Sequence, residues 1–191
     1  MDIERRAITG IEVRAAEGKP TKLSGYAAVF NSMSENLGGF REIILPGAFD
    51  RALREGHDVR ALVNHDPDQI IGRTKSGTLA LSVDAKGLRA EIDLPDTQAA
   101  RDVLTSVKRG DIDGMSFAFR TLTDAWRTQD GEAIRELVDL ELLDVSAVAY
   151  PAYPATSVSA RALDQAKQTV APAPPPGVPN EINEARLRLQ A

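Results

Sequence analysis

Alternating apolar and polar side chains predict a chain built mainly of short β-strands. The clearest case is the stretch Met-Ser-Phe-Ala-Phe-Arg at 115–120, in which every second side chain is apolar. This two-residue period is typical of a strand with one face in a core, and it places Ser116 on the opposite face. Gly114 lies just before it and lets backbone or substrate approach closely. The stretch therefore offers a hydroxyl on a rigid element.

Similar patterns predict further strands between turn residues. They are expected at about 7–13, 23–30, 41–45, 59–65, 70–73, 78–83, 88–94 and 133–148, with the serine strand at about 111–122. Residues 66–68 contain Pro67 and are expected to break the strand that ends at His65. Residues 84–87 and 130–131 are expected to form hairpin turns, the first with Gly87 at a positive φ.

Two segments have helical signals. The first covers 48–55 and ends at Gly56. The second begins at an N-cap, either Asp96 or Thr97, and runs to about Lys108 before Gly110. Many short strands and two helices predict a mainly β fold with some α (α+β), a closed or nearly closed β-barrel with the helices packed outside it. A β-sandwich is the main alternative.

The composition changes at about residue 160. Five of the ten residues 170–179 are proline, which predicts an extended linker, and 181–190 could form a short helix. We therefore expect one domain over 1–159, with its barrel core at about 7–155. Residues 160–191 are expected to be a proline-rich linker and short C-terminal helix, either a disordered tail or a segment with a role of its own.

Composition and charge exclude several kinds of site. The 191 residues carry a net charge of −5, so nucleic acid is not an expected partner. The absence of cysteine excludes disulfides, thiol nucleophiles and zinc–thiolate centres. No metal or cofactor is expected. The sequence has no apolar signal core at its start and no apolar run of membrane-spanning length, which predicts a soluble, cytosolic protein.

A serine nucleophile needs a base, and the chain has only two histidines. His57 follows Gly56 among charged residues, a usual place for a solvated histidine. His65 ends an apolar strand face, shared with Val59, Ala61 and Val63, and adjoins a loop. Taken alone, it could be a core or rim histidine held by hydrogen bonds. As a base for Ser116 it is the better candidate.

A third group should orient the imidazole and stabilise its charged form. On the strand at 133–148 a two-residue period groups Leu140, Leu142, Asp144, Ser146 and Val148 on one face. A carboxylate among apolar neighbours needs a cation or water, because a buried unpaired charge is costly. Asp144 is therefore the expected acid. Glu141, expected on the opposite face with Asp139, is the reserve.

The order of these pieces resembles a known family, the prohead (procapsid) maturation proteases of tailed bacteriophages, which are similar to the herpesvirus assemblins. The matching pieces are spread over residues 8–155. They are Gly-Tyr-Ala-Ala-Val-Phe-Asn at 25–31, Glu-Ile-Ile-Leu-Pro-Gly-Ala-Phe at 42–49, Leu-Val-Asn-His-Asp at 62–66 with Ile-Gly-Arg at 71–73, Asp-Ala-Lys-Gly-Leu at 84–88, Gly-Asp-Ile-Asp-Gly-Met-Ser-Phe-Ala-Phe at 110–119, and Leu-Asp-Val-Ser-Ala-Val at 143–148 with Pro-Ala-Tyr-Pro at 151–154.

The resemblance implies roles for these residues. The family's catalytic histidine falls on His65 and its serine on Ser116. Asp144 stands where the family usually has glutamate before Val-Ser, one methylene longer. Assemblins also place arginines after this strand to support the oxyanion, where this chain has only Arg161, much later, and Arg120 beside the serine strand. Backbone amides would serve as oxyanion donors.

The resemblance also implies a fold and a function. The fold would be an assemblin-like β-barrel ringed by helices. The protein would be a serine endopeptidase that works in the assembling prohead, in the cytoplasm of the host bacterium. Its substrates would be the scaffolding segment of the major capsid protein and the protease itself. It would need no cofactor, would bind neither nucleic acid nor membrane, and could form a homodimer. Residues 160–191 would be a pro-segment or a scaffold-docking arm.

Two other functions fit the same residues. The first is a non-catalytic capsid assembly or scaffold protein with the same barrel. The second is a hydrolase of esters or small amides, which would act on small acyl substrates and be indifferent to capsid protein.

Overall fold

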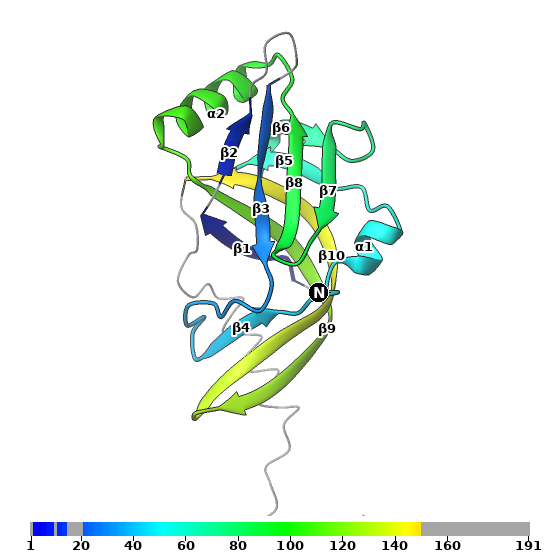
Figure 1. Ribbon diagram of the computed structural model, residues 1–191, viewed down its shortest axis with the longest axis vertical. Helices are drawn as coiled ribbons and strands as arrows, with labels where there is room; N and C mark the ends of the chain where they lie inside the picture. Colours follow the sequence, from blue (N-terminus) through cyan, green and yellow to red (C-terminus); the bar gives the residue numbers. More distant parts are fainter. Residues whose placement is uncertain (1, 10, 15–20, 150–191) are drawn as a thin grey trace, which may run out of the picture.

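Two β-sheets make up most of the described part of the protein, as the computed structural model shows (Figure 1). It describes residues 2–9, 11–14 and 21–149. The larger sheet has the strand order β1-β9-β10-β5-β6, with β4 also paired to β10, and the smaller sheet has the order β2-β3-β8-β7. In the larger sheet, β4 and β5 run parallel to β10, and the other pairs are antiparallel.

Most strands and both predicted helices lie near their predicted positions. The strand predicted over 7–13 is instead two strands in different sheets, and the serine strand covers 114–129 and not 111–122. The larger sheet contains β1 (Glu4–Thr9), β4 (Phe40–Ile44), β5 (Arg60–Val63), β6 (Asp66–Arg73), β9 (Gly114–Gln129) and β10 (Glu132–Val148). The smaller sheet contains β2 (Ile11–Arg14), β3 (Lys22–Val29), β7 (Leu79–Val83) and β8 (Gly87–Asp93). The helices are α1 (Asp50–Arg54) and α2 (Gln98–Arg109). The mainly β fold with a few helices is confirmed.

The core lies between the two sheets. Met115, Phe117 and Phe119 of β9 are buried, as their alternation predicts. The ring of Phe117 stacks on Phe119 at a centroid distance of 4.9 Å and packs in a T-shaped arrangement with the Phe49 ring at 5.5 Å. Side chains of the smaller sheet join the same cluster, among them Leu23. The side of β9 that carries Ser116 therefore faces away from this core.

The predicted closed barrel is not observed in the described part of the chain. The larger sheet ends at β1 and β6, and the smaller one at β2 and β7. β1 belongs to the larger sheet and β2, the next strand in the chain, belongs to the smaller one, so the two sheets pack around a shared core without a continuous ladder around it. Closure into a barrel stays a prediction.

The turns agree with the sequence at one hairpin and differ at another. Asp130 and Gly131 both have positive φ, 52° and 82°, between β9 and β10. Gly87 does not have the expected positive φ. Glycine is required there because a Cβ atom would lie 2.0 Å from the carbonyl oxygen of Ala28 on β3. Close approach of β3 and β8, and not turn geometry, explains this residue.

The second helix begins and ends where its caps predict. Of the two candidates, Thr97 is the N-cap, and its hydroxyl accepts a hydrogen bond from the Ala100 N–H. Gly110 ends the helix with a φ of 81°. The predicted linker and C-terminal helix at 160–191 lie outside the described residues. None of the described helices is long and apolar enough to cross a membrane.

Candidate active site

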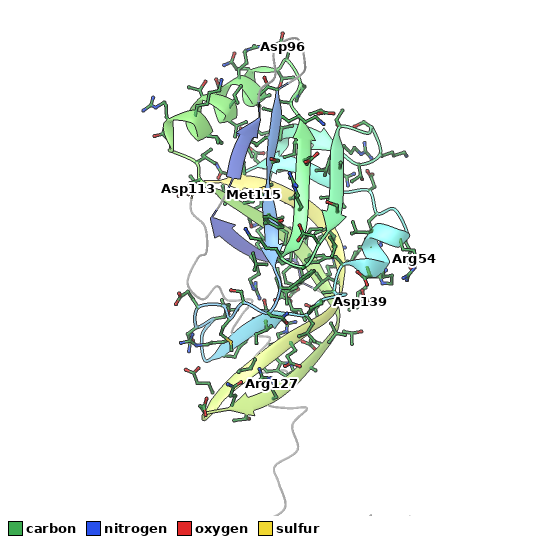
Figure 2. The ribbon with its side chains drawn as sticks, in the orientation of Figure 1. Arg54, Asp96, Asp113, Met115, Arg127 and Asp139 are labelled. Atoms are coloured by element: carbon green, nitrogen blue, oxygen red, sulfur yellow. The ribbon has the colours of Figure 1, made fainter. Side chains whose placement is uncertain are left out.

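Ser116 lies on β9 between two neighbouring strands. Across the sheet it is paired with Ala7 of β1 on one side and with Ser146 of β10 on the other. The residue is 3% exposed. The preceding residue, Met115, lies near the start of β9, at the far end of the strand from Arg127 (Figure 2). The serine thus belongs to the body of the molecule and not to the projecting tip of the β9–β10 hairpin.

His65 lies in a hairpin turn and not on a strand face. Val63 pairs with Asp66, which leaves Asn64 and His65 as the two turn residues between β5 and β6. Both have positive φ, 50° and 57°, the pattern of a type I′ turn. The expected break at 66–68 is wrong, because β6 begins at Asp66 and continues through Pro67 at the sheet edge, where a missing N–H is tolerated.

The turn conformation has a cost and a consequence. A non-glycine residue in the left-handed region costs roughly 1–2 kcal/mol. The turn is tied to β10 by Asn64, whose N–H donates to the Ala147 carbonyl (2.9 Å) and whose Oδ1 accepts from the Ala149 N–H (3.2 Å). The imidazole of His65 is therefore held next to the strand that carries Asp144.

A β-bulge brings Asp144 to the same side as Ser116. Leu142 pairs with Phe119 and Asp144 pairs with Ala118, so Leu143 is an extra residue on β10. Paired residues share a face, so Leu142 points into the core and Asp144 points to the other side. The expectation that Leu142 and Asp144 share a face is wrong for this reason. Without the extra residue, Asp144 would pair with a core phenylalanine.

The three predicted side chains meet in one hydrogen-bonded line. His65 Nδ1 lies 2.7 Å from Asp144 Oδ1, and His65 Nε2 lies 2.7 Å from Ser116 Oγ. The side chains of His65 and Asp144 are 9% and 13% exposed. Because a carboxylate can only accept hydrogen bonds, Nδ1 carries the proton and donates to Asp144, and Nε2 keeps a lone pair toward the serine.

The hydroxyl of Ser116 has a second acceptor. Its Oγ lies 2.8 Å from the carbonyl oxygen of Arg6 on β1. Since a hydroxyl has one proton, the Arg6 carbonyl and His65 Nε2 compete for it. Strand β1 therefore lies directly against the candidate nucleophile.

A buried group of charged side chains anchors β1. Arg6 donates to Glu42 (2.7 Å), and Arg135 on β10 donates to Glu4 (2.7 Å) and to Glu42 (3.2 Å). Burial raises the pKa of Glu4, but the hydrogen bond and charge of Arg135 outweigh it, so that this pKa lies below its ordinary value. Burial lowers the pKa of Arg135, but Glu4, together with Glu42 and Asp124, raises it above its ordinary value. Glu4 and Arg135 are therefore charged near neutral pH.

The other candidates lie apart from this line. His57 Nε2 lies 3.4 Å from Glu55 and 3.5 Å from Arg51, near α1. Glu141 accepts a hydrogen bond from Arg120 at 2.8 Å. Its pairing with Arg120 puts Glu141 on the Ser116 side of the sheet, contrary to expectation.

Two arginines were considered in the sequence for support of the oxyanion. The Arg120 guanidinium is bound to Glu141, and Arg161 lies outside the described residues. Within residues 2–9, 11–14 and 21–149, no group of three or more histidine, aspartate or glutamate side chains could hold a metal ion.

Ser146 also contacts the candidate triad, although the sequence pattern only placed it on the same strand face as Asp144 and gave it no role. The Oγ of Ser146 lies 2.8 Å from Asp144 Oδ1 and 3.2 Å from His65 Nδ1, and Ser146 is fully buried. Its position two residues after the acid was the available signal. A serine in a strand next to alanines is common, so that signal alone did not indicate a function.

A serine hydroxyl, an imidazole and a carboxylate joined in this order form the kind of site with which serine hydrolases make acyl-enzymes. The chain belongs to the caudovirus prohead serine protease family, whose sequence pattern matches residues 9–169. It is therefore a serine protease of the class that acts in capsid maturation of tailed bacteriophages.

A solved structure gives one further comparison. The capsid assembly protease gp21 of bacteriophage T4 is similar at a TM-score of 0.49 and 12% sequence identity, over 76% of this chain and 98% of that one. Comparison with curated protein sequences gives no match.

Proposed function

We propose that this protein is the endopeptidase that matures the prohead of its phage. It cleaves the scaffolding segment of the major capsid protein and itself, inside the assembling prohead in the cytoplasm of the host. The observation that carries the proposal is the unbroken line from Ser116 through His65 to Asp144, with both hydrogen bonds at 2.7 Å. Membership in the family supplies the class of reaction.

Each residue of the line has one task. Ser116 Oγ attacks the carbonyl carbon of the scissile peptide bond while His65 Nε2 takes its proton. The imidazolium then gives this proton to the leaving amine, which departs and leaves Ser116 acylated. Water attacks the acyl-enzyme, again with His65 as base, and releases the acid product and the free hydroxyl. No cofactor takes part in these steps.

Asp144 keeps the imidazole in the tautomer that this sequence requires. Its carboxylate accepts the Nδ1 proton, so that Nε2 is the nitrogen facing Ser116. Aspartate is one methylene shorter than glutamate. The distance of 2.7 Å to His65 indicates that the bulge at Leu143 and the hairpin turn compensate for the shorter side chain.

Attack requires Ser116 to give its proton to His65 and not to Arg6. We expect substrate binding to displace the Arg6 carbonyl from the hydroxyl, since the two contacts compete for one proton.

The proposed organisation places the protease domain at 1–159 and gives 160–191 the role of a pro-segment or scaffold-docking arm. A homodimer belongs to the same proposal.

Self-cleavage of the purified protein tests this function. Intact mass spectrometry of the full chain should show that the parent sheds part of its C-terminal segment, whereas Ser116→Ala and His65→Ala stay whole. His57→Ala is the matched control and should be cleaved like the parent. If all four proteins yield the same fragments, a contaminating protease makes them and the assignment is wrong.

The same measurement, repeated with capsid protein and with a small acyl substrate added, separates the alternatives. A non-catalytic assembly protein would leave the parent chain whole, even with capsid protein present. An ester or small-amide hydrolase would turn over small acyl substrates while both chain and capsid protein stay intact.

A further inference from the structure

A fourth polar side chain, Ser146, lies behind the candidate triad. It is paired with Ser116 across β9 and β10, so that both hydroxyls lie on the same side of the sheet. Ser146 has no exposed surface at all, and the steps of hydrolysis described above do not use it. A buried hydroxyl must have a hydrogen-bond partner, because leaving it unpaired costs about 1–3 kcal/mol.

The partners of Ser146 are both members of the candidate triad. Its Oγ lies 2.8 Å from Asp144 Oδ1 and 3.2 Å from His65 Nδ1. The carboxylate can only accept hydrogen bonds, so the hydroxyl of Ser146 donates a hydrogen bond to Asp144. The oxygen of Ser146 then presents its lone pairs to the Nδ1 proton of His65. Asp144 Oδ1 thus receives two hydrogen bonds, one from each neighbour.

This arrangement fixes two elements relative to each other. The imidazole comes from the β5–β6 turn, with its residue in a left-handed conformation. The carboxylate comes from the bulged part of β10 and has a rotatable bond that could turn it away from the histidine. The hydroxyl two residues further along the same strand holds one carboxylate oxygen in place for the Nδ1 proton.

We propose that Ser146 is a positioning residue of this protease, which orients the Asp144 carboxylate and, through it, the His65 imidazole. It does not touch the substrate. A serine that only filled space in a strand would need no charged partner, whereas this one donates to the acid of the triad. The proposal rests on the proposed function, since it assigns Ser146 to the same reaction.

The test is a double-mutant cycle on the reactivity of Ser116. The probe is an alkyl fluorophosphonate, which phosphonylates activated serines with loss of fluoride and therefore requires no knowledge of the peptide substrate. The maximal labelling rate and the half-saturating probe concentration are measured separately for the parent, Ser146→Ala, Asp144→Ala and the double variant. Ser24→Ala is the matched control, since Ser24 is a buried serine of the other sheet.

We expect Ser146→Ala to lower the maximal labelling rate about tenfold with the half-saturating concentration unchanged, because a small misplacement of the base slows the reaction and not the binding. In the Asp144→Ala background the same change should cost less than about twofold, because Ser146 acts through Asp144. Ser146→Thr keeps the hydroxyl and should retain most of the parent rate. Ser24→Ala should match the parent.

A spectroscopic measurement supports the cycle. The Nδ1 proton of His65, held in a short charge-assisted hydrogen bond, should give a low-field proton NMR signal in the parent. This signal should move in folded Ser146→Ala and stay in place in Ser24→Ala.

The possible failures are distinguishable. Equal losses from Ser146→Ala in both backgrounds, or an unchanged rate and NMR signal, would overturn the role of Ser146 and leave the protease assignment standing. A parent protein that the probe labels no faster than Ser116→Ala would overturn the proposed function, and this inference with it.

Discussion

At the scale of the residue, the choice between two carboxylates decides the chemistry of the site. Asp144 lies 2.7 Å from the histidine that faces Ser116, whereas Glu141 is bound to Arg120. The sequence placed both on one strand and ranked them in this order, but for an incomplete reason. The two-residue period put Asp144 on an apolar strand face, where it would need a cation. The period does not reveal the extra residue at Leu143, which turns Asp144 to the serine side.

This difference gives a residue-scale prediction. Asp144→Ala should lower the rate of self-cleavage about 10⁴-fold, the loss expected when a triad histidine no longer has its orienting acid. Glu141→Ala should leave that rate within about twofold, because an exposed ion pair contributes little. Gel densitometry of a cleavage time course is sufficient to measure both. The reverse result would move the role of the acid to Glu141.

At the scale of the element, the sequence predicts strands better than their ends and turns. Two-residue periods located nearly all of the strands, because burial of one sheet face imposes that period. They could not indicate that the strand ending at His65 stops two residues earlier and continues as a tight hairpin. A type I′ turn usually contains glycine, and Asn64-His65 lacks that signal. The hydrogen bonds of Asn64 to Ala147 and Ala149 hold the turn without a glycine.

Gly87 gives an element-scale prediction. Gly87→Ala should destabilise the protein by about 2 kcal/mol or more, because the added Cβ would force β8 away from β3. Gly77→Ala is the matched control. Gly77 has a positive φ of 71° but open space around it, so its loss should be limited to about 1 kcal/mol of backbone strain. Urea denaturation followed by circular dichroism would compare the two. Equal losses would show that close packing of the strands is not what selects glycine at 87.

At the scale of the whole molecule, a buried ion network joins the first strand to the centre of the larger sheet. Glu4 and Arg6 on β1 meet Glu42 on β4 and Arg135 on β10. The strand that this network holds also presents the Arg6 carbonyl to Ser116. Sequence patterns could not reveal the network, because its members are far apart in the chain and each resembles an ordinary surface charge.

Removing an arginine from the network should destabilise the folded protein. Arg135→Met should cost about 3 kcal/mol, since it removes one of the two arginines that pair with the buried carboxylates of Glu4 and Glu42 and leaves Arg6 alone beside them. Arg127→Met is the control on the neighbouring strand and should cost less than about 1 kcal/mol, because its pair with Glu136 is partly exposed. Denaturant titrations at neutral pH would measure both.

The lowered pKa of Glu4 sets the direction of the pH effect. A carboxyl whose pKa is lower in the folded state stabilises the protein above the range in which the unfolded residue titrates. That contribution should be lost as the pH falls below about 4, toward the pKa of folded Glu4. Glu4→Gln should flatten this part of the curve of stability against pH. An unchanged slope in Glu4→Gln would contradict the account of the network.

The role of Ser116 as nucleophile is tested most directly by mass spectrometry of the major capsid protein of the same phage, produced together with this protein. With the parent chain, we expect the capsid protein to lose its scaffolding segment by cleavage at defined positions. With Ser116→Ala, His65→Ala or Asp144→Ala it should stay at full length, and His57→Ala should act like the parent. Cleavage at the same positions by Ser116→Ala would contradict the claim that Ser116, activated by His65 and Asp144, is the nucleophile.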